Sequence, residues 1–398
     1  MSSIKALMIL NENPLEPSGG LGVHVKFLSD ELRKKNVELT VLCVDYTTQE
    51  GGFYIVGDEV KEVERKDWKY EKNSYRLLKI FNTNDFCMAA GFINKVITDD
   101  LFIETALEIL GNERFDVIHL HDSNLWRVAK NLRALFKAPI VMTCHLSFLL
   151  AHPKDPKNPY YLHDAQLEGM AMHGCNRLIT VSDNYKENLK RAYFIDKGTT
   201  IYNGVNYEFL SKMEYDQELR KKYNKPLVVF VGRLVPTKGI SLILKAVRQL
   251  PQFHFILIAN ISPTVEKINP LVKRLKRLKE KCKNFEWHNH LEQDKKWKLM
   301  KIADIGIMPS LHEPFGIVAL EWMSLGVPLI VSNIDGLNEF CNNKNSTPIN
   351  PLFLKGAIKS HERDVRILRN AVETAKQFTW ERVSKETLKI YEEMSKMQ

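Results

Sequence analysis

The stretch from Met308 to Pro328, MPSLHEPFGIVALEWMSLGVP, decides how the rest of the chain is interpreted. The apolar residues at 305–308 predict the end of a buried strand, and the run that follows the loop predicts a helix. Glu313 precedes that helix and Glu321 lies about one turn inside it. Both carboxylates can accept hydrogen bonds from the vicinal hydroxyls of a hexose or a ribose. Two incidental acids on a buried amphipathic helix explain the same pattern, so these residues alone leave both interpretations open.

The start of this predicted helix offers backbone donors. A helix N-terminus leaves its first N–H groups without intrahelical partners, and such groups bind anions or hydroxyls. Gly316 has no side chain that blocks access to its backbone, and Ile317 and Val318 follow it directly. We therefore expect a polar pocket built largely from backbone at this point of the chain.

Length and composition restrict the class of protein. The chain has 398 residues, which is too long for one core and predicts two domains. The N-terminus lacks a signal-peptide pattern and no apolar run is long enough to span a membrane, so a cytoplasmic location is predicted. The six cysteines are scattered without a C-x-x-C pair, which favours neither disulfides nor a zinc site. The formal net charge of +9 suits a polyanionic partner, namely nucleic acid or an anionic membrane surface, or a phosphate-bearing substrate.

The first half of the chain predicts a βαβ unit. An apolar strand at 4–10 is followed by a glycine-rich turn, a helix and a second strand at 37–44. Gly19 and Gly20 stand in that turn, where phosphates commonly dock between a strand end and a helix N-terminus. The turn is not G-x-G-x-x-G, so a nicotinamide cofactor is weakly supported, and a tight turn without a ligand is the alternative. Residues 46–95 are predicted to be irregular.

Three further strands are predicted at 117–120, 140–144 and 178–181, separated by helical patterns that indicate a parallel sheet. Ligands of open parallel sheets bind beyond the carboxyl ends of the strands. A single histidine at such a place is as well explained by a structural role. Polar residues follow all three strands, which favours a site: His121, Asp122, His145, Ser147, Ser182 and Asp183.

After a predicted linker at 202–225, a second α/β run begins with strands at 227–231 and 253–258 around a helix at 240–250. Arg233 and Lys238 lie in the loop after its first strand, where both can reach one diphosphate. An exposed pair of cations on a turn is the alternative. The helix at 270–283 is strongly basic, which a solvated face explains, and a membrane or nucleic-acid surface is the sharper alternative. Helices are predicted at 353–377 and 380–395.

Taken together, these motifs resemble a known family. The Gly-Gly turn, Gly232-Arg233-x4-Lys238-Gly239, the segment 313–321 and the ending at 378–383 are similar to retaining glycosyltransferases of the GT-B fold, family 4, in the glycogen-synthase-like group. The resemblance implies an α/β protein with two Rossmann-like domains that face each other across a cleft. Residues 1–207 would form the acceptor-side domain and 208–378 the donor domain, with a final helix at 379–398 that packs back on the first domain.

The resemblance also assigns roles to individual positions. It implies that Arg233 and Lys238 hold the donor diphosphate and that Glu321 binds the ribose hydroxyls. His145 matches the active-site histidine of the family, and Asp122 resembles a residue on the acceptor side. The donor-binding set that it implies is Gly19, Gly20, Arg233, Lys238, Glu313, Phe315, Gly316, Ile317, Val318 and Glu321, and the catalytic set is His145, Arg233, Lys238 and Glu313.

The implied chemistry needs no metal ion. Cleavage of a sugar–phosphate bond builds negative charge on the departing diphosphate, which fixed cations stabilise more in the transition state than in the ground state. The sequence contains no Asp-x-Asp motif, which would be expected if a divalent cation held the diphosphate. We therefore expect no metal and no cofactor, with the nucleotide-sugar as a substrate. Retention by same-face attack is implied by the resemblance.

Several functions remain open from the sequence. The first is transfer of a hexose, glucose by preference, from a UDP- or ADP-sugar to a hydroxyl acceptor, most simply a saccharide. The alternatives are a phage-type enzyme that glycosylates hydroxymethylated DNA bases, a nucleotide-sugar 2-epimerase, and a catalytically silent sensor. The loop at 333–339 departs from the family pattern, which leaves the contacts to the acceptor and the nucleotide base undefined. The segment at 146–164 is particular to this chain and is expected to shape the acceptor site.

Overall fold

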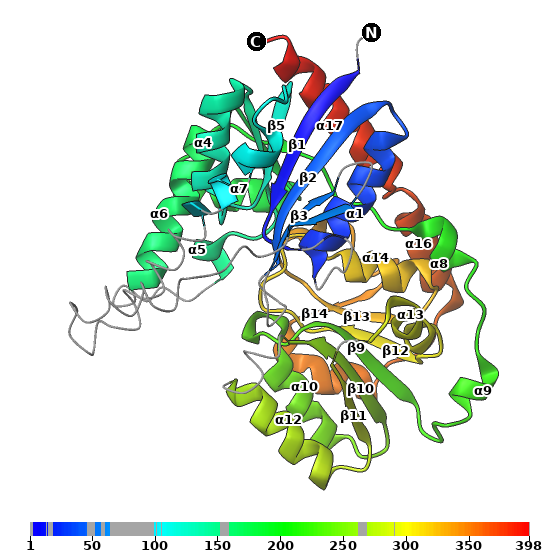
Figure 1. Cartoon of the computed structure of the whole chain (residues 1–398). Helices are drawn as coiled ribbons and strands as arrows, with labels where there is room; N and C mark the ends of the chain where they lie inside the picture. Colours follow the sequence, from blue (N-terminus) through cyan, green and yellow to red (C-terminus); the bar gives the residue numbers. More distant parts are fainter. Residues whose placement is uncertain are drawn as a thin grey trace, which may run out of the picture.

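The computed structural model places two α/β domains one above the other (Figure 1). It describes residues 3–12, 14, 19–45, 52–56, 60–63, 99–100, 102–104, 106–151, 159–261, 269–289 and 291–397. Most of the predicted irregular segment at 46–95, and parts of the loop at 11–22 and of the segment at 146–164, lie outside the described residues.

The N-terminal domain is built on an eight-stranded sheet with the order β4-β3-β2-β1-β5-β6-β7-β8. The predicted βαβ unit and the three later strands are confirmed, and their pairings are parallel. Two antiparallel strands, β3 and β4, extend the edge of the sheet within the segment predicted to be irregular, which corrects that prediction. The strands are β1 (Ile4–Leu10), β2 (Val37–Asp45), β3 (Gly52–Val56), β4 (Val60–Val63), β5 (Val117–His121), β6 (Ile140–Cys144), β7 (Arg177–Thr180) and β8 (Thr199–Thr200). Among the described residues, its helices include α1 (Gly20–Arg33), α4 (Trp126–Phe136), α5 (Phe148–Ala151), α6 (Pro159–Gly174) and α7 (Asp183–Tyr193).

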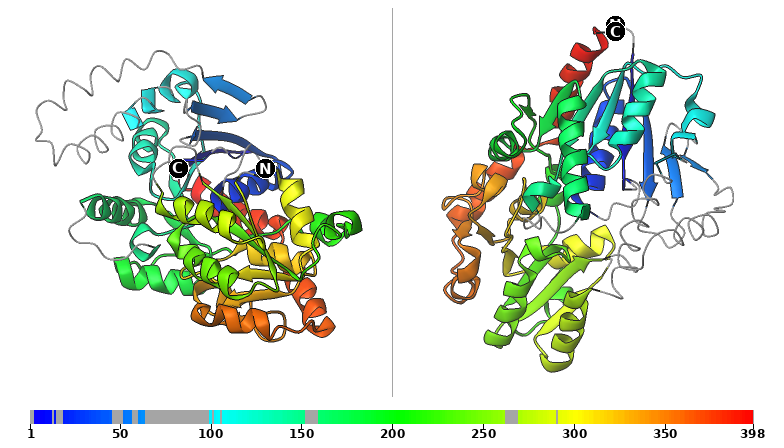
Figure 2. Two further views of the ribbon diagram at one scale, coloured as in Figure 1. Left: turned by 90° about the horizontal axis from the view of Figure 1, so that it is seen from below. Right: turned by 90° about the vertical axis from the view of Figure 1, so that its left-hand side faces the viewer.

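The C-terminal domain contains a six-stranded sheet with the order β11-β10-β9-β12-β13-β14, in which every pairing is parallel. Helices cover both faces, as the alternating strand and helix patterns predict (Figure 2). The strands are β9 (Leu227–Arg233), β10 (His254–Asn260), β11 (Phe285–His288), β12 (Ile305–Met308), β13 (Leu329–Ser332) and β14 (Thr347–Ile349). The helices are α8 (Tyr207–Ser211), α9 (Gln217–Arg220), α10 (Ile240–Gln249), α12 (Pro270–Lys281), α13 (Gln293–Lys301), α14 (Ile317–Ser324), α15 (Leu354–Lys359) and α16 (Val365–Lys376), with short 3-10 turns η1 (Pro236–Lys238), η2 (Asp335–Glu339) and η3 (Pro351–Phe353).

The helix predicted at 353–377 is two helices, α15 and α16. Asp364 ends the interruption, because its side chain accepts a hydrogen bond from the backbone N–H of Arg366 and so caps the start of α16. The predicted linker at 202–225 contains the short helices α8 and α9.

The last helix, α17 (Trp380–Ser395), returns to the N-terminal domain, as predicted. Its buried residues Val383, Ile390 and Met394 share one apolar cluster with the side chains of β1 and α1. The hydroxyl of Tyr391 lies 2.7 Å from Nδ1 of His119 on β5. Figure 1 shows α17 beside β1, with both chain termini at the same end of the molecule. The domain boundary between residues 207 and 208 stays a prediction.

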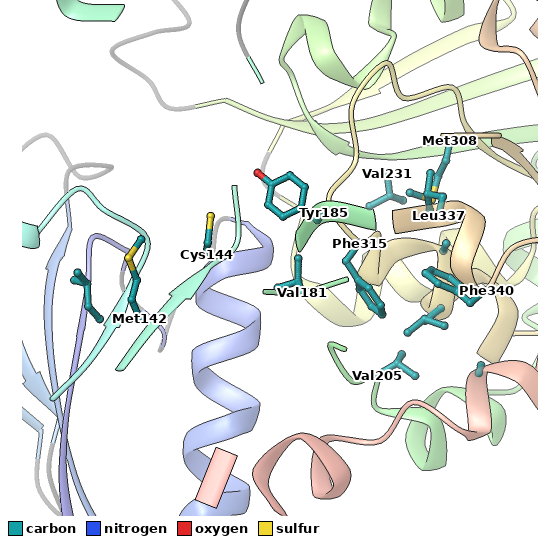
Figure 3. Packing of buried hydrophobic residues seen from close by; sticks show 14 of the residues in the cluster. Met142, Cys144, Val181, Tyr185, Val205, Val231, Met308, Phe315, Leu337 and Phe340 are labelled. Carbon is teal, nitrogen blue, oxygen red and sulfur yellow. The ribbon is translucent and has the colours of Figure 1, made fainter. Parts of the chain in front are cut away.

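One apolar cluster extends through both domains, so their contact is a continuous packed core. Figure 3 shows Met142, Cys144, Val181 and Tyr185 of the N-terminal domain on one side and Val231, Met308, Phe315, Leu337 and Phe340 of the C-terminal domain on the other, with Val205 beside the second group. The five cysteines of the described residues are free thiols. In the part of the chain that the structure describes, no helix is both long and apolar enough to cross a membrane.

Candidate active site

The loop before α14 depends on a glycine for its shape. Gly316, the residue that caps α14, has a φ of 104°, which is a left-handed conformation that side chains disfavour. A Cβ atom at this position would also lie 2.5 Å from Cδ2 of Leu337. Both the dihedral angle and the space therefore require glycine at this position.

Glu313 lies in this loop and is bound to a cation from the neighbouring strand end. Its Oε2 atom lies 2.5 Å from Nζ of Lys238, and both side chains are largely buried. Lys238 ends η1, and the next residue, Gly239, has a φ of 70°. A Cβ atom on Gly239 would lie 2.0 Å from the carbonyl oxygen of Pro309. The close approach of the two loops at this glycine is what brings the predicted Lys238 and Glu313 together.

Glu321 is buried inside α14 and also has a cationic partner. Nζ of Lys296 lies 2.9 Å from its Oε1 atom, and the indole N–H of Trp297 donates to the same oxygen at 3.1 Å. Lys296 and Trp297 belong to α13, and neither was predicted as part of the site. Nothing in the sequence around residue 296 marks it out, because its role depends on how α13 packs against α14.

Arg233 is exposed at the end of β9 and faces the glycine turn of the N-terminal domain. A Cβ atom on Gly19 would lie 3.7 Å from Cδ of Arg233, and one on Gly20 would lie 4.0 Å from Cδ1 of Ile317. The backbone N–H of Gly19 donates to Glu12 at 2.6 Å. The predicted glycines and the predicted Arg233 therefore meet at the contact between the domains.

Asp122 and His145 are held together at the ends of β5 and β6. Oδ1 of Asp122 accepts hydrogen bonds from the backbone N–H groups of His145 at 2.6 Å and of Leu146 at 3.2 Å. Burial raises the pKa of Asp122 to about 7, although these two bonds and the positive charge of Arg233 oppose the shift. Asp122 also has a φ of 60°, which aspartate tolerates better than most residues. Its carboxyl group therefore shapes the backbone that carries His145.

Around His145 lies a cluster of buried imidazoles that the sequence only partly predicted. Nε2 of His145 lies 3.0 Å from Nδ1 of His121, and Nδ1 of His24 on α1 lies 2.7 Å from Oδ1 of Asn203. Burial lowers the pKa of His24 to about 4, and it also holds the pKa values of His121 and His145 well below the ordinary range. These rings are therefore neutral at pH 7 and act as hydrogen-bonding groups.

One ring nitrogen from each of His24, His121 and His145 lies within 4.8 Å of the others, a spacing that can hold a metal ion. However, the contacts of His24 with Asn203 and of His121 with His145 are distances typical of hydrogen bonds between neutral groups. We interpret the cluster as a hydrogen-bonded network. The expectation that the site needs no metal stays a prediction.

The third predicted strand end, with Ser182 and Asp183, serves the contact between the domains. The hydroxyl of Ser182 donates to the carbonyl of Pro314 at 2.6 Å and thereby fixes the loop that carries Glu313. The backbone N–H groups of Asp183 and Asn184, at the start of α7, donate to the carboxylate of Glu339. The unusual loop at 333–339 therefore contributes an acid that caps a helix of the other domain.

Two other residues predicted to belong to the site, Phe315 and Ser147, have buried side chains that contact other protein groups. The side chain of Phe315 is buried among the rings of Tyr202, Phe340 and Phe378, so any part it takes in donor binding falls to its backbone. Ser147 donates to the buried carboxylate of Glu168 at 2.7 Å. Of the three strand ends predicted to share one crevice, two bring their polar residues into contact, namely His121, Asp122 and His145.

Two families of known proteins match the two halves of the chain. The family described as "Glycosyltransferase Family 4" matches residues 88–209, and "Glycosyl transferases group 1" matches residues 211–375. An uncharacterized glycosyltransferase of Methanocaldococcus jannaschii is 27% identical, with 98% of each chain covered.

Two solved structures share the fold. A sucrose-phosphate synthase from Thermosynechococcus elongatus has a TM-score of 0.77 at 18% identity and covers 99% of this chain and 100% of its own. An Anabaena protein in complex with UDP-glucose has a TM-score of 0.65 at 18% identity, with 98% and 99% covered. With both domains matched and the fold shared over nearly its whole length, the chain belongs to the family 4 glycosyltransferases and has the GT-B fold.

Proposed function

We propose that this glycosyltransferase transfers glucose, with retention and without a metal ion, from UDP- or ADP-glucose to a hydroxyl of a saccharide. The observation on which the proposal depends most is the buried pair of Lys238 and Glu313, which stands beside the N-terminus of α14 and near Arg233. Cations and helix N–H groups at one place suit a diphosphate, and a fixed carboxylate suits the hydroxyls of a sugar. UDP-glucose is the ligand of the Anabaena protein with the same fold, which supports this donor.

In the proposed reaction, the bond between the anomeric carbon and the diphosphate oxygen breaks while the acceptor oxygen bonds to the same face of that carbon. The acceptor proton passes to the departing phosphate oxygen, so charge and atoms balance without an enzymic base. Arg233 and Lys238 stabilise the charge that grows on the leaving diphosphate. Glu321 would bind the ribose hydroxyls, and the neutral imidazole of His145 would orient the sugar or the acceptor.

The proposal is tested first by a donor screen that compares UDP, ADP and GDP sugars by their effect on the melting temperature. A ligand that binds only the folded state raises this temperature, by an amount that grows with the logarithm of its concentration divided by its Kd. Labelled UDP-glucose and ADP-glucose then report donor hydrolysis and transfer. We expect turnover to persist in EDTA and to fall by at least a hundredfold in Arg233→Ala, because one stabilising contact to a developing charge contributes about that factor.

Product analysis decides the remaining alternatives. A product with the anomeric configuration of the donor supports retention, and an inverted product refutes it. A changed sugar that forms without any acceptor identifies an epimerase. Full activity in both Arg233→Ala and Glu321→Ala would mean that the donor site has been assigned to the wrong residues.

A further inference from the structure

One face of the C-terminal sheet is covered by three helices, each of which has lysines or arginines on its exposed side. The buried sides of α10, α12 and α15 form one apolar cluster with the strands, and their outer sides are exposed. Arg274 of α12 donates to the hydroxyl of Ser241 on α10 at 3.1 Å, which ties these two helices together. We call their exposed cations the basic face: Lys245, Arg248, Lys273, Arg274, Lys276, Arg277, Lys279, Lys281, Lys355 and Lys359.

The three helices that carry the basic face have a net charge equal to that of the whole protein. The three helices contain ten lysines and arginines and one acid, Glu280, which gives +9. The full chain has 57 cations and 48 acids, so the remaining residues contain 47 of each sign. The excess of positive charge in the sequence is therefore matched by the charge on one side of one domain, where clustered cations create a positive electrostatic potential.

Neighbouring carboxylates do not neutralise this face. Among the described residues, no ion pair links a carboxylate to any of the nine cations other than Lys276. Elsewhere in the C-terminal domain, cations commonly have such partners, as with Arg220 and Asp304 or Lys221 and Glu218. The positive potential of the basic face is thus available to an external partner.

Two large apolar side chains stand exposed in the turn directly before the third of these helices. Leu352 and Phe353, immediately before α15, are 72% and 70% exposed, and the cation Lys355 follows two residues later. An exposed aromatic and aliphatic pair beside cations is the combination with which proteins enter the boundary between lipid headgroups and acyl chains. A nucleic acid partner gives no reason for the exposed leucine.

We propose that the basic face docks on an anionic lipid surface, with Phe353 and Leu352 entering the headgroup region. The helices lie flat on a sheet, so their cations spread over a broad face that suits a membrane better than the groove of a duplex. Attraction of each lysine or arginine to an anionic bilayer contributes roughly a fivefold gain in affinity. This docking does not depend on the proposed transfer reaction.

The test measures flotation of the full-length protein with vesicles of phosphatidylcholine alone or with 30% phosphatidylglycerol. The test variant is the triple substitution Lys273→Gln, Arg277→Gln, Lys281→Gln on α12. Its matched control removes three exposed cations from elsewhere in the same domain: Lys222→Gln, Lys295→Gln, Lys298→Gln. Lys295 and Lys298 belong to α13, whose buried residues Trp297 and Met300 pack in the apolar cluster on the other face of the sheet. These control cations therefore lie across the sheet from the basic face.

We expect binding only to the anionic vesicles, a loss on the order of 100-fold in the α12 variant, and little change in the control variant. Phe353→Ser should weaken binding by a factor that salt does not change, because it removes an apolar contact. Equal losses in both triple variants would overturn the proposal, since they would show attraction to net charge alone. Binding to duplex DNA in preference to vesicles, or to neither, would also overturn it. Unchanged melting temperatures confirm that the variants are folded.

Discussion

Removal of the buried carboxylate of Glu168 should destabilise the segment that follows His145. Glu168 on α6 accepts hydrogen bonds from the hydroxyl of Ser147 at 2.7 Å, from the backbone N–H of Phe148 at 3.0 Å and from the hydroxyl of Tyr193. In Glu168→Ala these three donors lose their acceptor. A buried donor left without a partner costs about 1–3 kcal/mol. Relief of the cost of burying a charge offsets part of the sum, and we expect a net loss of about 3–5 kcal/mol.

Urea denaturation at pH 7 gives the free energy of unfolding of this variant. Glu168→Gln is the control, because it keeps the shape and one accepting oxygen, and we expect it to lose about 1–2 kcal/mol. Donor turnover should fall further in the alanine variant than in the glutamine variant, since the backbone beside His145 depends on the same bonds. If both variants unfold within about 0.5 kcal/mol of the wild type, the reasoning that these bonds hold the segment is refuted.

Three further predictions concern single positions. The pKa of Asp122 is raised to about 7 from 3.8, so between pH 4 and 7 the native state keeps a proton that the unfolded state loses. The free energy of unfolding should therefore fall by up to about 1.4 kcal/mol for each unit by which the pH rises in this range. Melting of Asp122→Asn, measured as a function of pH, should lack this contribution, and equal slopes in the variant and the wild type would contradict it. Gly336→Ala places a Cβ atom 2.0 Å from the carbonyl oxygen of Pro314 and should lower the free energy of unfolding, measured by denaturation, by at least about 2 kcal/mol. Gly356 lies in an exposed helix with no atom within 4 Å of the added Cβ, so Gly356→Ala should raise the free energy of unfolding by up to about 1 kcal/mol. Lys296→Met leaves the buried carboxylate of Glu321 without its cation and should weaken donor binding by at least tenfold, measured by calorimetry. The same substitution at the exposed neighbour Lys295 should leave the affinity for the donor within twofold of the wild type.

Much of the fold was predictable because its signals are local. Buried parallel strands appear as short apolar runs between helical patterns, and this alternation predicted the parallel sheets of both domains. The pair of β3 and β4 was missed, since a charged and aromatic segment at a sheet edge has no such run. The break between α15 and α16 was also missed, although Asp364, its cap, is a recognisable start signal.

The site was predictable where a motif fixes residues by spacing and was not where distant segments meet. Lys238 and Glu313 come from two loops whose sequences each contain a recognisable pattern. Lys296 reaches Glu321, and Glu339 reaches the start of α7, only through the packing of whole helices and domains. No property of the residues near positions 296 or 339 contains that information, because the partner lies on another element.

The partners of the two glutamates bear on which groups can move protons. A carboxylate oxygen that already accepts a charge-assisted hydrogen bond has fewer lone pairs left to accept a proton from a substrate. Glu313 is bound to Lys238, and Glu321 to Lys296 and to the indole of Trp297, so each glutamate has a donor on at least one oxygen before any substrate arrives. Oxygens that are held in place in this way are suited to bind hydroxyl groups in fixed positions. The neutral imidazole of His145 also has a hydrogen-bond partner, His121. These contacts favour a reaction in which the leaving phosphate oxygen takes the acceptor proton and the protein supplies position and charge.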